Sequence, residues 1–440
     1  MDKRILALAA CLTLLSSCGI YTKFESPEVE DSSIVGSQVA LNDESIVELP
    51  SWRDYFTDPK LQSLIEVALE SNSDLQIASL NITQAQRSLT TARLAMLPTI
   101  SFSAQGTVTN LTSASYSLPL SASWELDVFG RKRNASRQAS SVVEQTKEYE
   151  LMVQTQLIEA VALNYYALIL ADQQLSITGE SLAIMEESLA SMQLLMEVGI
   201  LNRVALEQAK ASYNSIELAI ETLKASVLLT SNNLNLLLNL PPQNIERSDA
   251  ITLSSIDIEP SISLSALSAR PDVRYAEAQL SQSFYGVNYA RSSLYPSITI
   301  GGSVTYTAGD FILSALASLT QPIFAAGANL ANLANAKDIY QQQLLAFEKS
   351  LLNAGKEVND AIVSNQAAQR KSVIAQTQVS TLLDAVNTTQ ALMDSGSVNY
   401  LEVLTAQSSY LSARVDHATY LYNEAVAQIN LYKALGGGVQ

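Results

Sequence analysis

The sequence is nearly devoid of the residues that build metal and catalytic centres. It has two cysteines, Cys11 and Cys18, and a single histidine, His417. One chain therefore cannot assemble a zinc site, a Ser-His-Asp triad or a Cys-His pair. Beyond residue 18 it has no thiol for a disulfide either, so packing must stabilise the fold. We predict no enzyme, catalytic residue, cofactor or metal site. A carboxylate mechanism stays formally open, but no acid pair supports it.

Positive charge and long apolar runs are also scarce. The chain has 26 Lys plus Arg against 43 Asp plus Glu, a formal net charge of −17. An acidic chain without a basic patch lacks the electrostatic footprint of nucleic-acid binding, so no nucleic-acid partner is expected. After residue 18 no window of 18 apolar residues occurs, and no transmembrane helix is predicted. If the mature chain crosses a membrane, it must do so as strands of a closed barrel.

The N-terminus has the pattern of an export signal with a lipid attachment site. A short positive segment precedes an apolar run that is too short to span a bilayer. The run ends in Leu-Ser-Ser-Cys at 15–18, which resembles the lipobox of bacterial lipoproteins. We predict a signal peptide at 1–17, lipidation of Cys18 and a lipid-anchored leader at 18–58. Gly19 after the cysteine is typical of lipoproteins sent to the outer membrane.

An internal duplication dominates the rest of the chain. The segment 195–202 matches 392–399 in layout, and further matched pairs keep an offset between 195 and 198 residues. A register held over such a length indicates duplication of one structural unit. We predict a first repeat at 59–250, a second at 251–435 and a tail at 436–440. Each repeat is expected to contain a helix, a β-hairpin and two long helices joined by a turn.

Short stretches of alternating apolar and polar residues predict one β-hairpin per repeat, at 98–126 and 296–322. Period-two alternation gives a strand one apolar and one polar face. Each run has about ten residues, the length that a tilted strand needs to cross the hydrocarbon. Four strands are too few to close a barrel, because about eight is the smallest closed size. Closure therefore requires several chains; the alternative is a small sheet in an aqueous core.

Long segments without proline predict helices at 131–198, 202–240, 328–395 and 399–434. Apolar residues recur in heptads along them, which favours coiled-coil packing. A helix of 68 residues, the first of the four, reaches about 100 Å. That length suits a structure that projects across a compartment. The alternative is a solid helical bundle.

Taken together, these features resemble the TolC-like outer-membrane efflux protein family, in its lipoprotein branch. The resemblance covers essentially the whole mature chain. It is carried by the lipobox, the two hairpins that begin at proline, the pattern Gly-x5-acid-Val-Leu-x-Ala-Gln at 396–407, and the ending at 434–438. It implies an α+β membrane protein with two structural repeats per chain. Three chains would form a 12-stranded β-barrel, four strands from each, continued by a long α-helical barrel of coiled-coil helices.

The same resemblance implies a function. The expected protein is a homotrimeric, passive exit duct for small molecules such as drugs and toxic compounds. It would be anchored in outer-membrane lipid, extend into the periplasm, and work with a periplasmic adaptor (membrane fusion) protein and an inner-membrane pump. Two alternatives stay open: the outlet of a type I protein secretion system, and a non-channel coiled-coil outer-membrane lipoprotein. Substrate identity is not encoded in the sequence.

The turns between the long helices are the predicted docking tips. Gly199 and Gly396 are suited to end a helix in the left-handed conformation. Asn202 and Asn399 follow three residues later, where an asparagine caps the returning helix. In the family this tip is the closed periplasmic entrance and the docking surface of the adaptor. A purely structural turn is the alternative reading.

Two acids near the tips are candidates for an entrance gate. Glu402 occupies a position where the family carries an entrance acid, and Glu207 lies near the first tip. Thr405 stands where a second acid often follows, so part of the family pattern is missing. Three carboxylates around one axis would repel one another and concentrate cations. The alternative is an acid on a solvated helix surface.

Overall fold

The structure is a computed structural model and falls into two compact units. It describes residues 22–27, 40–41, 50–108, 115–199, 202–253, 261–262, 267–307, 309–320 and 327–438. The first unit comprises 1–30, 78–150 and 271–351; the second comprises 31–77, 151–270 and 352–440. The predicted signal peptide and Cys18 lie outside the described residues. Within the part of the chain that is described, no helix combines the length and the apolar character needed to cross a bilayer.

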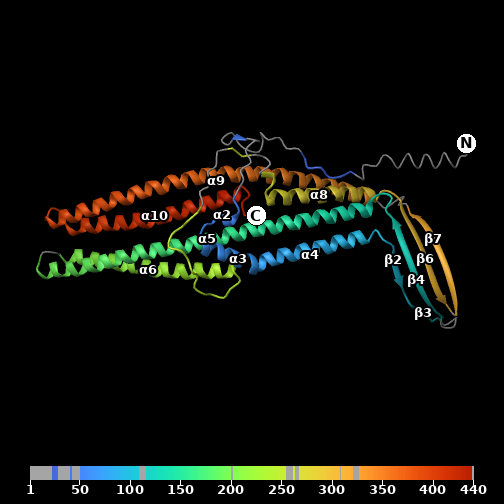
Figure 1. Cartoon of the computed structure of the whole chain (residues 1–440), viewed down its shortest axis with the longest axis horizontal. Coiled ribbons are helices and arrows are strands. Elements are labelled where there is room, and N and C mark those ends of the chain that lie inside the picture. The colour runs from blue at the N-terminus through green and yellow to red at the C-terminus, as the bar shows by residue number, and fades with distance from the viewer. Residues whose placement is uncertain are drawn as a thin grey trace. The chain divides into compact units, whose positions relative to one another are not determined.

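The first unit contains one antiparallel sheet whose strands lie side by side (Figure 1). Its strands are β2 (Thr99–Phe102), β3 (Gln105–Thr107), β4 (Ser115–Leu126), β6 (Ser297–Thr307) and β7 (Asp310–Thr320). The order is β2-β4-β6-β7, and β3 continues β2 along the same side of β4. The two hairpins, one from each repeat, therefore join through the β4–β6 pairing into one sheet.

A proline in β4 explains why β2 and β3 are separate strands. Phe102 pairs with Leu120 and Gln105 pairs with Ser117, so the register is the same on both sides of the gap. Pro119 lies opposite the gap and has no N–H to donate. Its carbonyl still accepts from the Ser103 N–H at 3.1 Å. The strand is interrupted because Pro119 lacks the N–H donor at this position. It is not interrupted by a bulge, because the register is unchanged across the gap.

The first unit also contains helices that pack against one another. They are α4 (Ser73–Leu94), α8 (Pro271–Ser292) and the N-terminal parts of α5 (Arg131–Glu197) and α9 (Ala328–Asp394). Ala85 and Leu89 of α4 bury against Val143 of α5. Between α5 and α8, the Ser141 and Ser281 hydroxyls lie 2.9 Å apart. Small and polar side chains at these seams allow the helices to approach closely.

The second unit is built from two long helical hairpins and a small helical subdomain. The elements are α2 (Trp52–Tyr55), α3 (Pro59–Ser71), α6 (Arg203–Leu237), α10 (Tyr400–Ala434), the remainder of α5 and α9, and a short parallel pair of β1 (Ala40–Leu41) with β5 (Ser261–Ile262). The long helices α5, α6, α9 and α10 occupy the segments where the sequence predicts helices.

The core of the second unit is rich in aromatic residues. Trp52 and Tyr55 of α2 are buried among side chains of α3, α5, α6 and α10. The Tyr55 and Tyr432 rings are stacked with centroids 4.2 Å apart. The segment before α3, which the sequence predicts only as a leader, is thus part of the fold.

A buried hydrogen-bonded node ties α3 to α5 in this core. Asp58 caps α3 by accepting from the Lys60 N–H at 2.9 Å, and Pro59 follows at the first helical position. The second oxygen of Asp58 accepts from the Tyr165 hydroxyl at 2.6 Å. The same hydroxyl accepts from the Ser248 N–H at 3.0 Å. Burial and the bond to Asp58 raise the pKa of Tyr165 to about 12.

Candidate functional site

The register gives the sheet one continuous apolar face. Val304 pairs with Leu120 on one side and Leu313 on the other, and each of these side chains is exposed in the single chain. The same face carries further apolar side chains from all four strands: Ile100, Phe102, Leu118, Trp124, Ile298, Ile300, Tyr306, Phe311 and Leu319. Leu313 is 81% exposed, so nothing in the described part of the chain covers it. A soluble sheet would bury such a face.

The opposite face is lined by hydroxyl groups. Ser303 pairs with Ser121 and Ser314, directly beside the Val304 row. Most other residues with this orientation are serine or threonine; the apolar exceptions are Pro119 of β4 and Ile312 and Leu316 of β7. A sheet that is apolar on one face and hydroxylated on the other fits a wall between lipid and water.

Both edges of the sheet are open. Strands β2 and β3 occupy one edge and β7 the other, and each pairs on one side only among the described residues. Unpaired N–H and C=O groups along an edge are a template for another strand. A strand of a second chain can therefore pair with each of these edges.

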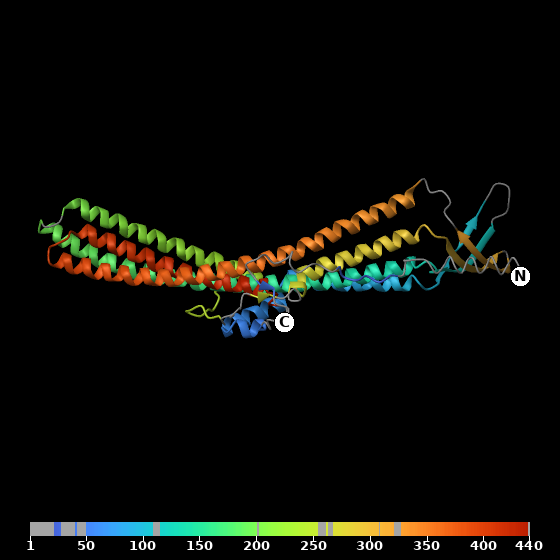
Figure 2. The same ribbon diagram turned by 90° about the horizontal axis from the view of Figure 1, so that it is seen from above.

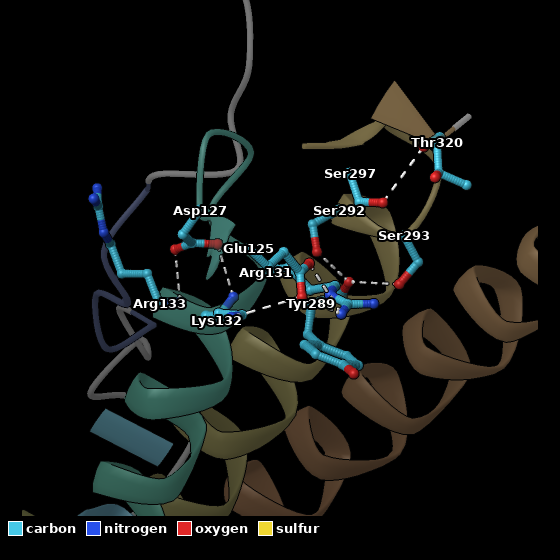
Figure 3. A network of polar contacts seen from close by, with 10 residues as sticks. All are labelled: Glu125, Asp127, Arg131, Lys132, Arg133, Tyr289, Ser292, Ser293, Ser297 and Thr320. Atoms are coloured by element: carbon cyan, nitrogen blue, oxygen red, sulfur yellow. Dashed lines mark hydrogen bonds and ion pairs between the residues drawn. The ribbon is translucent and has the colours of Figure 1, made fainter. Parts of the chain in front are cut away.

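A polar joint connects the sheet to α5, as Figure 3 shows. Asp127 caps the helix by accepting from the Lys132 and Arg133 N–H groups at 2.8 and 2.9 Å. Glu125, the last acid of β4, pairs with Arg131 at 3.1 Å and with Lys132 at 3.6 Å. Glu125 forms ion pairs with two cations of α5, and Asp127 accepts hydrogen bonds at the N-terminus of this helix. These interactions fix the direction of α5 relative to β4.

Next to the joint lies a cavity of about 350 Å³. Its wall includes Glu125, Arg131, Tyr295 and Asn329, and the stacked rings of Phe129 and Tyr295, with centroids 5.0 Å apart, close one side. The sequence prediction of no basic stretch was wrong here, because three consecutive cations at 131–133 begin α5. The formal net charge of −17 describes the whole chain and does not reveal these three local cations.

The turn at the end of each long helical hairpin depends on one glycine and one asparagine. Gly199 and Gly396 have φ of 78° and 72°, a conformation that glycine adopts without strain. Asn202 caps α6 by accepting from the Ala205 N–H at 2.9 Å. Asn399 caps α10 by accepting from the Leu401 N–H at the same distance. Both turns lie at the same end of the second unit in two perpendicular views (Figures 1 and 2).

Side chains from both hairpins pack together near these turns. The tip cluster consists of Met185, Met192, Leu206, Ala209, Tyr400 and Leu404, with Leu189, Met196, Ala205, Tyr213, Ile216 and Met393 packed against it. Burial raises the pKa of the Tyr400 hydroxyl. Because the cluster combines α5 and α6 with α9 and α10, it holds the two hairpins to each other.

Substitution of the tip glycines is expected to be costly for backbone reasons alone. A Cβ on Gly199 would meet open space, yet an L residue in this conformation costs about 1–2 kcal/mol. Gly199→Ala should therefore lower the midpoint of thermal unfolding. Gly179 lies inside α5 and is also surrounded by open space. Gly179→Ala, the matched control, should raise the midpoint through a helix-propensity gain of about 1 kcal/mol. Equal effects of the two changes would contradict this account.

The two candidate gate acids lie in different electrostatic surroundings. Glu207 is exposed and pairs with Arg203 at 3.8 Å and Lys210 at 3.5 Å. Glu402 is exposed on the first turn of α10, and its N–H donates to the Asn399 side chain at 3.3 Å. In the described part of the chain, Glu402 has no ion-pair partner. Glu207 thus has two cations within 4 Å, whereas no such pair is described for Glu402.

The remaining candidate residues have no catalytic geometry. His417 is half-buried on α10, and burial lowers its pKa. Among the described residues, no three His, Cys, Asp or Glu side chains gather as a metal-binding group. The predicted lipidation site, Cys18, lies outside the described part of the structure.

Comparison with known proteins identifies the class. The pattern of the family "Outer membrane efflux protein" matches the chain twice, at residues 64–240 and 263–437. The chain is 30% identical to "Cation efflux system protein CusC" of Escherichia coli O157:H7, with 98% of each chain covered. It is 29% identical to "Probable outer membrane lipoprotein SilC" of Salmonella typhimurium, with 88% of each covered. The open state of the Neisseria gonorrhoeae MtrE outer membrane channel superposes with a TM-score of 0.84, at 27% identity, over 96% of this chain and 99% of that one.

These matches and the fold define a transport protein of the outer membrane. The chain belongs to the outer membrane efflux protein family. It is the outer-membrane channel component of a tripartite efflux system, it extends into the periplasm, and it is not an enzyme. The predicted fold class, long helices with antiparallel strands in two repeats, is confirmed. The alternative of a non-channel coiled-coil lipoprotein is wrong.

Proposed function

We propose that three copies of this chain form one duct through which small molecules leave the periplasm. The observation that supports this most strongly is the sheet of four strands side by side, with β3 continuing β2, which has one apolar face and two open edges. Four strands cannot close on themselves. In the trimer β7 of one copy pairs with β2 of the next, which completes twelve strands. The apolar face then contacts lipid, and the hydroxyl face lines the pore.

Exposed apolar residues on the long helices support the same assembly. Leu218 and Leu236 of α6 are 70% and 75% exposed in the single chain, and Val373 and Ile374 of α9 are similarly exposed. A neighbouring copy covers these side chains when the helices of three chains form one wall. Residues 59–250 and 251–435 then act as two equivalent halves of each subunit.

The partners and the anchor are part of the same proposal. The tips at Gly199, Asn202, Gly396 and Asn399 dock the periplasmic adaptor, which links the duct to an inner-membrane pump. Cleavage after residue 17 and lipidation of Cys18 anchor the leader in the outer membrane. Because the relative covered over 98% of its length is named a cation efflux protein, we include metal cations among the transported solutes.

The direct test is conductance of the purified, lipidated protein in a planar bilayer. We expect discrete channel openings and a trimer that survives detergent without heating. Native mass spectrometry should give three copies per particle. A monomer without conductance that stays soluble after removal of its lipid would overturn the proposal.

The charge of Glu402 leads to a specific prediction. Glu402→Gln should lower the cation-to-anion permeability ratio roughly twofold or more at low ionic strength, because it removes three charges from one constriction. Glu207→Gln is the matched control for charge number, because it also removes one carboxylate per chain, beside Arg203 and Lys210; an equal drop in both variants would assign the effect to net charge and not to the position of Glu402. Reversal potentials in a salt gradient measure both. An unchanged ratio in Glu402→Gln would show that this acid does not line the entrance.

A further inference from the structure

A cavity in the first unit lies between α4, α5 and α8, apart from the cavity beside the polar joint. Its volume is about 410 Å³, which is within the range of small-molecule sites. Three side-chain amides line it, from Asn81, Gln84 and Gln145, together with the tyrosines Tyr149 and Tyr275. None of the described residues in its lining carries a formal charge. The cavity is therefore a neutral, polar site.

The two tyrosines form an ordered platform in this cavity. The Gln145 amide donates to the Tyr275 hydroxyl at 3.1 Å, which holds this ring in place. The rings of Tyr149 and Tyr275 have centroids 6.2 Å apart and planes inclined by 47°. Tyr149 is 44% exposed, so part of its ring is accessible to a solute. A tyrosine offers such a solute both a ring face and a polar hydroxyl.

Helix periodicity places the cavity on one side of α5. Thr146 and Tyr149 both line the cavity, and residues three apart share a side of a helix. Glu144 precedes Thr146 by two residues, which is about 200° around the helix axis. Glu144 therefore lies on the opposite side, where it is exposed and pairs with Lys147 at 3.0 Å. This part of α5 thus has a neutral side and a charged side.

The polar joint connects the neutral side of α5 with the hydroxyl face of the sheet. Arg131 lies two heptads before Gln145 and so on nearly the same side of the helix. It pairs with Glu125 at 3.1 Å. Glu125 belongs to the hydroxyl face, because it follows Ser121 and Ser123 at intervals of two residues in β4. In the proposed duct that face lines the pore, and the cavity opens on the same side.

The leader contacts α5 on the side away from the cavity. Arg137 lies nine residues before Thr146, which is two and a half helical turns and hence opposite. Its guanidinium donates to the Thr22 carbonyl at 3.4 Å and lies over the Tyr285 ring, 5.6 Å from the centroid. The Phe24 N–H donates to the Tyr285 hydroxyl at 3.2 Å. A leader that begins at a lipid anchor runs outside the duct, so the cavity faces inward.

We propose that this cavity binds an uncharged saccharide on the inner wall of the duct. A charged solute finds no counter-charge among the lining residues. An apolar solute leaves the amides and hydroxyls without partners. A saccharide has an apolar ring face for tyrosine and hydroxyl groups that donate to and accept from the amides. This inference rests on the proposed function in one respect, that the chain forms a duct.

The first test measures ion current through the full-length lipidated protein in a planar bilayer. The uncharged probe is N,N′-diacetylchitobiose, a disaccharide that carries hydroxyl and amide groups. We expect brief interruptions of the current whose frequency saturates with the probe concentration. Tyr149→Ala should weaken this block about tenfold, because the accessible ring is lost. Glu144→Ala, on the opposite side of α5, is the matched control and should leave the block unchanged.

Single cysteines test which side of α5 lines the pore. Beyond Cys18, which is acylated in the proposed mature protein, the sequence has no cysteine, so the background reaction is low. A charged thiosulfonate that reacts with thiols should change the conductance of Thr146→Cys channels. It should leave the conductance of Glu144→Cys channels unchanged. Thermal unfolding verifies that each variant folds.

Three results would overturn the saccharide site. They are conducting channels without saturable block by the disaccharide, equal weakening of the block by Tyr149→Ala and Glu144→Ala, and modification that leaves the conductance of Thr146→Cys unchanged. In each case the channels still conduct, so the proposed function stands. A protein that does not conduct at all contradicts the proposed function and removes the basis of the saccharide site with it.

Discussion

Val304→Arg is expected to abolish heat-resistant trimers and outer-membrane insertion. Val304 lies between Leu120 and Leu313 on the apolar face of the sheet. An arginine near the middle of the hydrocarbon costs about 2–4 kcal/mol on the lipid face. In the proposed trimer three copies carry this cost, so the assembled duct would lose about 6–12 kcal/mol. Cell fractionation and unheated gel electrophoresis measure the effect.

The matched control for this change is the preceding residue. Ser303 faces the hydroxyl side, between Ser121 and Ser314. Ser303→Arg should leave trimers intact and instead lower cation conductance, because three positive charges enter the pore. Equal damage from both substitutions would mean that the two faces do not separate lipid from water.

Asp58→Ala is expected to destabilise the second unit strongly. It removes the cap of α3, which is worth about 0.5–2 kcal/mol. It also leaves the buried Tyr165 hydroxyl without its acceptor, at a cost of about 1–3 kcal/mol. Together we expect a loss of about 2–4 kcal/mol, measured as a lower thermal midpoint in detergent. Asp416, exposed on α10, is the control position; Asp416→Ala should stay within about 0.5 kcal/mol.

The same node makes a prediction about alkaline pH. Tyrosine in the unfolded chain has a pKa near 10, and burial raises the pKa of Tyr165 to about 12. The folded state therefore keeps this proton where the unfolded state loses it. The contribution is complete below pH 10 and is lost as pH rises from 10 to 12. Tyr165→Phe should flatten this part of the pH profile. An unchanged alkaline slope would show that Tyr165 does not contribute.

The strands and the long helices were predictable because each pattern reflects one physical boundary. A sheet with one apolar and one hydroxyl-rich face alternates residue by residue, so the hairpins at 98–126 and 296–322 stand out in the sequence. Heptads mark helices packed along their length. Neither pattern identifies the neighbour that covers a given side chain. This is why the cluster in which side chains of all four long helices pack together was not predicted.

The connecting segments were harder to predict, because their packing partners are distant in sequence. Trp52 lies in a helix of four residues, which is too short to show periodicity. Asp58 followed by Pro59 is a recognisable helix start. The tail beginning at 436 looks flexible, yet Gly437 packs against the Tyr432 ring, where a Cβ would come within 2.5 Å. Only glycine fits there.

The open edges of the sheet have a consequence for the cell. In the proposed trimer, a subunit has two open sheet edges and a broad exposed apolar surface until it meets two other copies. Such surfaces promote aggregation. Assembly of a subunit with two other copies therefore competes with its aggregation. The yield of finished ducts is expected to rise more steeply than in proportion to the concentration of subunits.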